Sequence, residues 1–300
     1  MKNHNLYDQC KLCPRECDVA RSQGQKGICG VTDRLRIARA ALHFWEEPCI
    51  SGTAGSGAVF FSGCNLRCVY CQNCDISSGG VGREMNDDAV IRAFDQLVEQ
   101  GAHNINLVTP THFVHRLASL LEKYNSPVPV VYNCGGYESV ETLRRLDGLV
   151  DIYLPDFKYA DNTLASAFSN APDYFERACE AIAEMNRQVG TLILDDSGVV
   201  VRGLIVRHLV LPGAVSNTKS VLRWIKENLP AGTAVSLMSQ YTPCGKAVDM
   251  PPLDRKISKY EYDIAVNEML KLGFDNGYIQ SRRSARKDFI PDFGALEGLD

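Results

Sequence analysis

Short apolar runs alternate with amphipathic segments along most of this chain. Runs of strand length, most of them nearly continuous in apolar residues, occupy 58–61, 104–108, 128–132, 152–154, 204–211 and 235–238. Segments with apolar residues at helical spacing lie between or after them, at 87–99, 113–124, 139–146, 173–187, 217–228 and 259–272. Strands that are apolar on both faces and alternate with helices are typical of an α/β fold, so the pattern predicts a parallel sheet or a partial barrel.

Three regions depart from this alternation. Residues 34–45 alternate only in part between apolar and basic side chains, which predicts a strand or hairpin, and the Pro-, Gly- and Ser-rich stretch 47–57 reads as a connection. Residues 191–201 place Asp-Asp-Ser-Gly between two apolar runs, which predicts a β-hairpin outside the repeat. We therefore divide the chain into an N-terminal cysteine-rich segment (1–50), a barrel domain (51–280) and a C-terminal tail (281–300).

The overall composition changes this picture little. The chain has 300 residues, 45% of them hydrophobic and 23% charged, which suits a protein with a sizeable core. Its formal net charge of −4 gives no electrostatic reason to expect nucleic acid or an anionic membrane as a partner. The first residues are not followed by the apolar region of a signal peptide, and no apolar run approaches the roughly 20 residues of a membrane-spanning helix. These features predict a cytoplasmic protein.

The cysteines change the picture much more. Eight of the twelve lie before residue 75 in two tight groups, and in a chain without a secretory signal their spacing favours metal binding over disulfide bonds. The first group, C-x2-C-x3-C-x11-C, suits a tetrahedral zinc site or an accessory iron–sulfur cluster, and the sequence leaves both open. Its members are Cys10, Cys13, Cys17 and Cys29. Such a site could also stabilise the fold without taking part in catalysis.

The second group directly follows the apolar run 58–61, so it lies at the C-terminal end of a strand, where parallel α/β folds place their chemistry. Cys64, Cys68 and Cys71 have the spacing C-x3-C-x2-C and can bind three corners of a cubane iron–sulfur cluster, which leaves one iron open. If Cys74 also bound, the cluster would be closed and would serve mainly for electron transfer. The spacing alone leaves both clusters as alternatives.

Polar residues follow the other predicted strands: Thr109, Thr111, His112, Asn133, Asp156, Lys158, Arg207, His208, Gln240 and Tyr241. Simpler explanations exist, because a lone histidine is more often a hydrogen-bonded structural residue, and Asp156 and Lys158 could form a surface ion pair that contributes little. Side chains alternate along a strand, so only one of Arg207 and His208 should face the interior, and we favour Arg207. Polar residues at every strand end are nevertheless hard to explain by packing.

The stretch from Cys64 to Asn73, with the aromatic Tyr70 directly before the last cysteine, resembles the cysteine loop of the radical S-adenosylmethionine (SAM) superfamily. Over roughly residues 8–280 the chain is similar to the pyruvate formate-lyase activating enzyme-like branch, and specifically to members with an extra N-terminal C-x2-C-P-R-x-C segment. The resemblance implies a partial (β/α)6 barrel and an open [4Fe–4S] cluster on Cys64, Cys68 and Cys71. SAM would chelate the open iron and be cleaved reductively to a 5′-deoxyadenosyl radical, which takes a hydrogen from the substrate.

The same resemblance implies a set of cofactor-binding residues: Tyr70, Asn73, Thr109, Thr111, Asn133, Asp156, Lys158 and Arg207. Thr109 and Thr111 stand where the superfamily has a Gly-Gly-Glu-Pro stretch that holds the methionine amino group, so the partner of that group stays open. Asp156 and Lys158 resemble the Asp-x-Lys motif of the activating enzymes. Because a fourth thiolate would block the cofactor, we expect Cys74 not to be a ligand.

These implications lead us to expect a radical enzyme that activates a glycyl-radical-type partner protein or, equally compatible with the sequence, acts on a small molecule. A flavodoxin or ferredoxin would supply the electron. The alternatives from other classes are a closed-cluster electron-transfer protein and a zinc-stabilised binding protein. Cys134 and Cys244 lie near strand ends and could donate hydrogen, although a small buried thiol is the more common finding. No residue pattern names the substrate.

Overall fold

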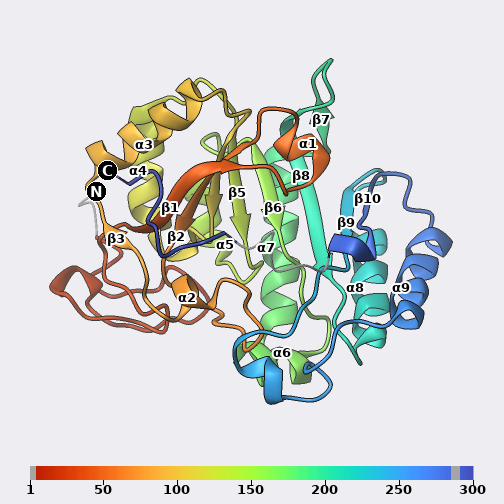
Figure 1. Ribbon diagram of the computed structural model, residues 1–300. Coiled ribbons are helices and arrows are strands. Elements are labelled where there is room, and N and C mark those ends of the chain that lie inside the picture. The colour runs from red at the N-terminus through yellow and green to blue at the C-terminus, as the bar shows by residue number, and fades with distance from the viewer. Residues whose placement is uncertain (1–4, 285–290, 300) are drawn as a thin grey trace.

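Seven parallel strands form the centre of the molecule (Figure 1). The computed structural model describes residues 5–284 and 291–299. All six predicted strands are present, as β2 (Ser56–Phe61), β4 (Ile105–Val108), β5 (Val130–Cys134), β6 (Ile152–Pro155), β8 (Val200–Leu209) and β9 (Ala234–Met238). An additional strand, β10 (Gly277–Ile279), pairs in parallel with β9. Among the described strands the spatial order β10-β9-β8-β6-β5-β4-β2-β1-β3 does not close, which confirms the predicted α/β partial barrel.

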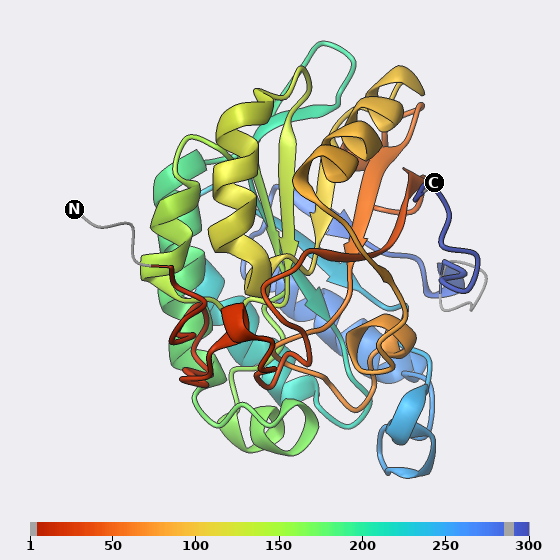
Figure 2. The same cartoon turned by 90° about the vertical axis from the view of Figure 1, so that its left-hand side faces the viewer.

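Helices cover the outer face of this sheet (Figures 1 and 2). They are α3 (Asp87–Glu99), α4 (Val114–Tyr124), α5 (Val140–Leu143), α7 (Tyr174–Val189), α8 (Val215–Asn228) and α9 (Lys259–Lys271). The short helix α6 (Asn162–Ser169) lies below the sheet in Figure 1, beyond the ends of the strands. Local signals set several ends: the side chain of Asn86 caps α3, and Ser258 and Glu261 form a capping box at α9. The predicted helices are confirmed, whereas α6 was not predicted.

Antiparallel strands extend the sheet at one edge and at β8. β1 (Arg36–His43) pairs with β2, and β3 (Arg83–Glu84) pairs with β1. β7 (Ile193–Leu194) forms a hairpin with β8. The strand expected within 34–45 and the hairpin expected within 191–201 are therefore both confirmed.

The stretch after β1 is more than a connection. It crosses the front of the parallel strands and forms α1 (Pro48–Ser51) beside β8 (Figure 1). Cys49 and Ile50 of α1 are buried against Val131, Ile152, Leu154, Val200, Ile205 and Ala234. Most of these strand residues alternate with residues that pack on the outer helices, so they lie on the inner face of the sheet. We call residues 44–52 the plug, because they fill the inner face of the open barrel; this packing corrects the reading of 47–57 as a simple connection.

Short elements and the C-terminal segment complete the chain. The short elements are η1 (Arg21–Gln23), α2 (Cys74–Ser77), η2 (Thr111–Phe113), η3 (Arg144–Leu146), η4 (Gly245–Asp249) and η5 (Arg282–Ser284). Residues 291–299 return to β1, where the Ala40 amide donates to the Glu297 carbonyl at 2.9 Å. Residues 285–290 and 300 of the predicted tail lie outside the described residues. Within the described residues, no helix combines the length and the apolar character needed to cross a membrane.

Candidate active site

The loop with the second cysteine group leaves the C-terminal end of β2, and its first turn requires glycine. Gly63 has φ of +87°, and a Cβ there would lie 2.7 Å from the Cys29 carbonyl oxygen. The amide of the next residue, Cys64, donates to that same carbonyl at 3.3 Å. An L side chain at position 63 would meet both a steric clash and a strained backbone. The N-terminal segment and the cysteine loop therefore meet through a tight backbone contact.

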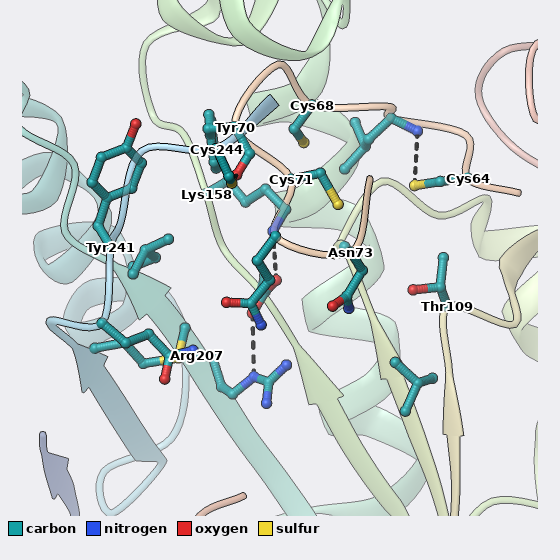
Figure 3. Close-up of a pocket in the computed structure, with 18 of the residues that line it drawn as sticks. Cys64, Cys68, Tyr70, Cys71, Asn73, Thr109, Lys158, Arg207, Tyr241 and Cys244 are labelled. Atoms are coloured by element: carbon teal, nitrogen blue, oxygen red, sulfur yellow. Dashed lines mark hydrogen bonds and ion pairs between the residues drawn. The ribbon is translucent and has the colours of Figure 1, made fainter. Parts of the chain in front are cut away.

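The thiols of Cys64, Cys68 and Cys71 line one cavity (Figure 3). Each sulfur accepts one hydrogen bond, from the Leu66 amide at 3.4 Å, the Ser169 hydroxyl at 2.9 Å and the Ser77 hydroxyl at 3.4 Å respectively. Burial raises the pKa of Cys64 to about 11 and that of Cys71 to about 12. The free thiols of Cys64 and Cys71 are therefore protonated at neutral pH, and a bound metal would displace their protons.

Cys74 lies apart from this group. It is the first residue of α2 and does not belong to the cavity lining, and its sulfur is 3.8 Å from Oδ1 of Asp75. The other three sulfurs surround a space rather than one point: within residues 5–284 and 291–299, no three Cys, His, Asp or Glu side chains converge as ligands of a single ion. A cubane cluster binds each thiolate at a separate iron, so this spread arrangement suits a cluster.

The cavity holds about 1160 Å³ of empty space, part of it open to solvent. The strand ends supply most of its polar lining. Of the residues expected from the sequence, it is lined by Cys64, Cys68, Tyr70, Cys71, Asn73, Thr109, Asn133, Asp156, Lys158 and Arg207. Gln240, Tyr241, Cys134 and Cys244 line it as well. A concave site with apolar walls and a few converging polar groups is typical of a small-molecule site.

A network of buried charges forms one side of this cavity. Lys158 Nζ lies 2.5 Å from Oδ2 of Asp156, and Arg207 Nε lies 3.2 Å from Oδ1 of the same carboxylate. Burial opposes the ionisation of Asp156, but Lys158 and Arg207 outweigh it and hold the pKa of this carboxyl below its ordinary value. The neighbouring His208 points to the other side of β8 and bonds the Phe157 carbonyl. Arg207 is therefore the residue of this pair that faces the interior, as the alternation predicts.

Two acidic residues of the plug join this network, and the sequence analysis missed both. Glu46 Oε2 lies 2.8 Å from Arg207 Nη1, and Glu47 Oε2 lies 3.9 Å from the same atom. Asn106 and Asn133 donate to the other oxygen of Glu46 at 3.2 and 3.3 Å. Burial raises the pKa of Glu47, with Arg207 opposing it. In the sequence, two glutamates before Pro-Cys-Ile are only a weak indication of a functional site. The fold is needed to see that both side chains reach the barrel interior.

Tyr70 and Asn73 of the cysteine loop differ in how they are held. The Tyr70 hydroxyl lies 2.6 Å from that of Tyr159, which in turn lies 2.7 Å from the Ser169 hydroxyl beside Cys68. By contrast, Oδ1 of Asn73 is buried and has no hydrogen-bond partner within the described residues. An unsatisfied buried acceptor in a cavity wall is available to a ligand.

The two threonines after β4 lie in different surroundings. Thr109 lines the cavity and has φ of +59°, which is strained for a β-branched residue. Thr111 does not line the cavity, because the turn η2 directs its hydroxyl to Oε1 of Glu138 at 2.6 Å. His112 is buried and bonds the Ser62 carbonyl at 2.8 Å, which is a structural role.

Cys244 closes the cavity from the C-terminal side. Its sulfur donates to the Tyr70 carbonyl at 3.1 Å, so the loop after β9 holds the cysteine loop directly. Cys134, at the end of β5, is buried, and burial raises its pKa well above the ordinary thiol value. Cys134 is therefore a thiol rather than a thiolate when no metal is bound.

The middle of the chain matches a known family. Residues 58–195 match the family model of the Radical SAM superfamily, the superfamily that the cysteine loop resembles. Two curated relatives come from Methanocaldococcus jannaschii. The uncharacterized protein MJ0674 is 29% identical over 280 residues, which cover 90% of this chain and 77% of the relative. The uncharacterized protein MJ0808 is 22% identical over 310 residues, which cover 96% and 86% respectively.

Solved structures with a similar fold include methylornithine synthase (PylB), with a TM-score of 0.49 and 14% identity over 78% of this chain and 63% of that one. Native anSMEcpe with bound AdoMet has a TM-score of 0.46 and 13% identity over 70% of this chain and 57% of that one. This chain thus spans less than two thirds of either solved chain.

Proposed function

We propose, from the superfamily match of residues 58–195, that this protein is a radical SAM enzyme with a [4Fe–4S] cluster on Cys64, Cys68 and Cys71 and SAM at the open iron. The observation that carries the proposal is the single cavity shared by these three thiols and the polar strand ends. Three protein ligands leave one iron free, and Cys74 lies outside the cavity lining. When bound, these groups supply a 5′-deoxyadenosyl radical that takes a hydrogen from the substrate.

The residues around the cavity offer complementary contacts for SAM. Oδ1 of Asn73 is a free acceptor for an amino or hydroxyl donor. Lys158 and Arg207 supply positive charge for the methionine carboxylate, and the ionised Asp156 holds both cations in place. Thr109, whose strained backbone stands where the superfamily holds the amino group, completes this side of the proposed binding site.

We assign the protein further to the pyruvate formate-lyase activating enzyme-like branch, on the Asp156-Phe157-Lys158 motif and the extra N-terminal cysteines. In that assignment the substrate is a glycyl-radical-type partner protein, and a small molecule is the second candidate. A further cavity continues from Asn73 and Gln240 to Trp45, which is 60% exposed, and offers a route for either substrate. The electron would come from a flavodoxin or ferredoxin. All twelve cysteines are free, as expected in the cytoplasm, where we place the protein.

An anaerobic assay tests the proposal. The protein is reconstituted with iron and sulfide, reduced with dithionite and mixed with SAM. We expect 5′-deoxyadenosine as product and a change in the EPR spectrum of the reduced cluster when SAM is added. An EPR spectrum that is indifferent to SAM, together with no 5′-deoxyadenosine, would refute the proposal.

Matched cysteine variants test the ligand assignment. Cys71→Ala should abolish both the product and the SAM-sensitive signal. Cys74→Ala should retain both, because this residue lies outside the cavity lining. Loss of the cluster in Cys74→Ala would favour the closed, electron-carrying alternative.

A further inference from the structure

The N-terminal cysteines enclose a second cavity, next to the cysteine loop. It holds about 290 Å³ of empty space, part of it open to solvent, and its lining includes Cys10, Cys13, Cys17 and Cys29. Backbone hydrogen bonds fold the segment back on itself, since the Cys10 amide donates to the Val19 carbonyl at 3.1 Å and the Asp18 amide to the Cys10 carbonyl at 3.0 Å. Cys17 is half-buried, the other three are buried, and all four thiols are free. The fold has thus gathered four thiols around one space without joining them.

Arg21 gives this cavity an unusual charge. Its side chain is fully buried and donates to the carbonyls of His112 at 2.7 Å and Thr32 at 2.6 Å. Among residues 5–284 and 291–299, its guanidinium forms no ion pair with a carboxylate; it bonds neutral carbonyls and lies 4.8 Å from the centre of the Tyr7 ring. Nη1 of Arg21 lies 3.6 Å from the Cys10 sulfur. A guanidinium is always protonated, and a buried charge without a counter-charge costs several kcal/mol. Negative charge at the cysteine sulfurs would therefore stabilise the buried Arg21 guanidinium.

The arrangement of the thiols distinguishes a cluster from a zinc ion. Zinc would draw four sulfurs to about 2.3 Å from one point. In the described part of the chain no three Cys, His, Asp or Glu side chains converge in that way. The four N-terminal thiols instead surround a cavity, as the three thiols of the cysteine loop do. Thiolates bound to separate irons of a cubane need this wider arrangement.

We propose that Cys10, Cys13, Cys17 and Cys29 bind a second [4Fe–4S] cluster, and that Arg21 balances its negative charge. With four protein ligands this cluster has no open iron, so it does not bind SAM. The proposal goes beyond the function proposed above, because the site needs none of the residues assigned to the SAM cavity. The two sites are nevertheless in contact: His112 lines the second cavity and bonds the Ser62 carbonyl, directly before the cysteine loop.

Metal and sulfide analysis of the full-length protein, reconstituted anaerobically, tests the proposal. We expect roughly eight irons and eight sulfides per chain in the wild type. The variant Cys64→Ala/Cys68→Ala/Cys71→Ala should keep roughly four of each, with an EPR signal after dithionite reduction that does not respond to SAM. A triple variant that holds zinc instead of iron, or no metal, would overturn the proposal.

A single ligand variant separates this proposal from the proposed function. Cys17 is half-buried, so Cys17→Ser is a mild change. It should remove the SAM-insensitive signal and keep the SAM-sensitive one. The matched control is Cys179→Ser, a half-buried cysteine on α7 outside both cavities, which should leave both signals unchanged. If Cys17→Ser kept the wild-type iron content and both EPR signals, the second cluster site would be overturned, even if the variant still produced 5′-deoxyadenosine.

The role of Arg21 has its own readout. Reduction adds negative charge to the cluster, so Arg21→Gln should make the midpoint potential of the SAM-insensitive signal more negative, and Arg21→Lys should restore part of the shift. Failure of Arg21→Gln to fold, with Arg21→Lys folded, would show the same need for a positive charge. An unchanged potential in a folded Arg21→Gln would overturn the charge-balancing role.

Discussion

Replacing Arg207 by methionine tests the charge network that connects the plug to the barrel. Arg207 is the only cation within ion-pair distance of Glu46 in residues 5–284 and 291–299, and it shares Asp156 with Lys158. The side chains of Arg207 and Glu46 are only 14% and 10% exposed, so solvent screens this pair little. Methionine keeps an apolar, unbranched side chain but removes the guanidinium, so Glu46 is left with the two amide donors of Asn106 and Asn133.

The expected loss follows from these contacts. Removing one partner of a buried ion pair costs about 3–5 kcal/mol. Asp156 keeps Lys158 as a counter-charge, so we expect the lower end of this range, about 3 kcal/mol. With an unfolding entropy of about 2.1 cal/mol/K per residue, this loss lowers the Tm of a chain of this length by about 5 °C.

Urea denaturation of the metal-free protein, followed by circular dichroism, measures this loss. The exposed ion pair of Arg177 on α7 provides the control, because Arg177→Met should cost less than about 1 kcal/mol. Lys158 and Arg207 hold the pKa of Asp156 below its ordinary value. The stability that this provides is present above the ordinary carboxyl pKa and is lost as the pH falls through the lower folded pKa, so the difference between wild type and Arg207→Met should shrink in acid. A loss below about 1 kcal/mol at pH 7 would refute the view that these groups are charged and buried together.

Three further predictions concern single residues. Gly63→Ala should lower the iron content of the reconstituted protein and destabilise it by about 1–3 kcal/mol, because the new Cβ would lie 2.7 Å from the Cys29 carbonyl oxygen at φ of +87°. Metal analysis and urea denaturation measure the two effects, and wild-type values in both would contradict the reasoning. Ser169→Ala removes the hydrogen bond to the Cys68 sulfur and should make the potential of the SAM-sensitive cluster more negative, which an EPR redox titration measures. Burial raises the pKa of Glu138 to about 7, so its folded form retains a proton that the unfolded chain loses near its ordinary pKa of 4.5, and stability should fall between these two pH values. Glu138→Gln should remove this fall, and an unchanged pH profile of the unfolding free energy would refute the shift.

The alternation of apolar runs and helical segments was sufficient to predict the sheet, because strands covered on both faces leave a clear local signal. The strand β10 was not predicted, for a physical reason. The three residues of β10 lie at the sheet edge and are largely exposed, so they show no apolar run. The plug escaped prediction because its burial comes from contacts with distant strands, whereas its Pro- and Gly-containing sequence resembles a loop. The division of the chain at residues 50 and 280 stays a prediction.

The candidate site was predictable where residue type and position in the motif coincide. The cysteine spacing and the strand ends identified ten residues that line one cavity, from Cys64 to Arg207. Glu46 and Glu47 were missed because they reach the charge network around Arg207 through the fold of the plug rather than from a strand end. Thr111 was included because it follows a strand, but the turn after Pro110 directs it to Glu138. The roles of these residues as ligands of cluster and cofactor stay predictions.

The plug has a consequence for how such enzymes could diversify. It is one continuous segment between β1 and β2, and it places carboxylates inside the barrel without contributing a residue to the cysteine loop. Changes in its length or sequence could therefore alter the charge network around Arg207 while the cysteine loop stays intact. A chimera that exchanges residues 44–52 between this protein and a relative would test whether this short segment determines the choice of substrate.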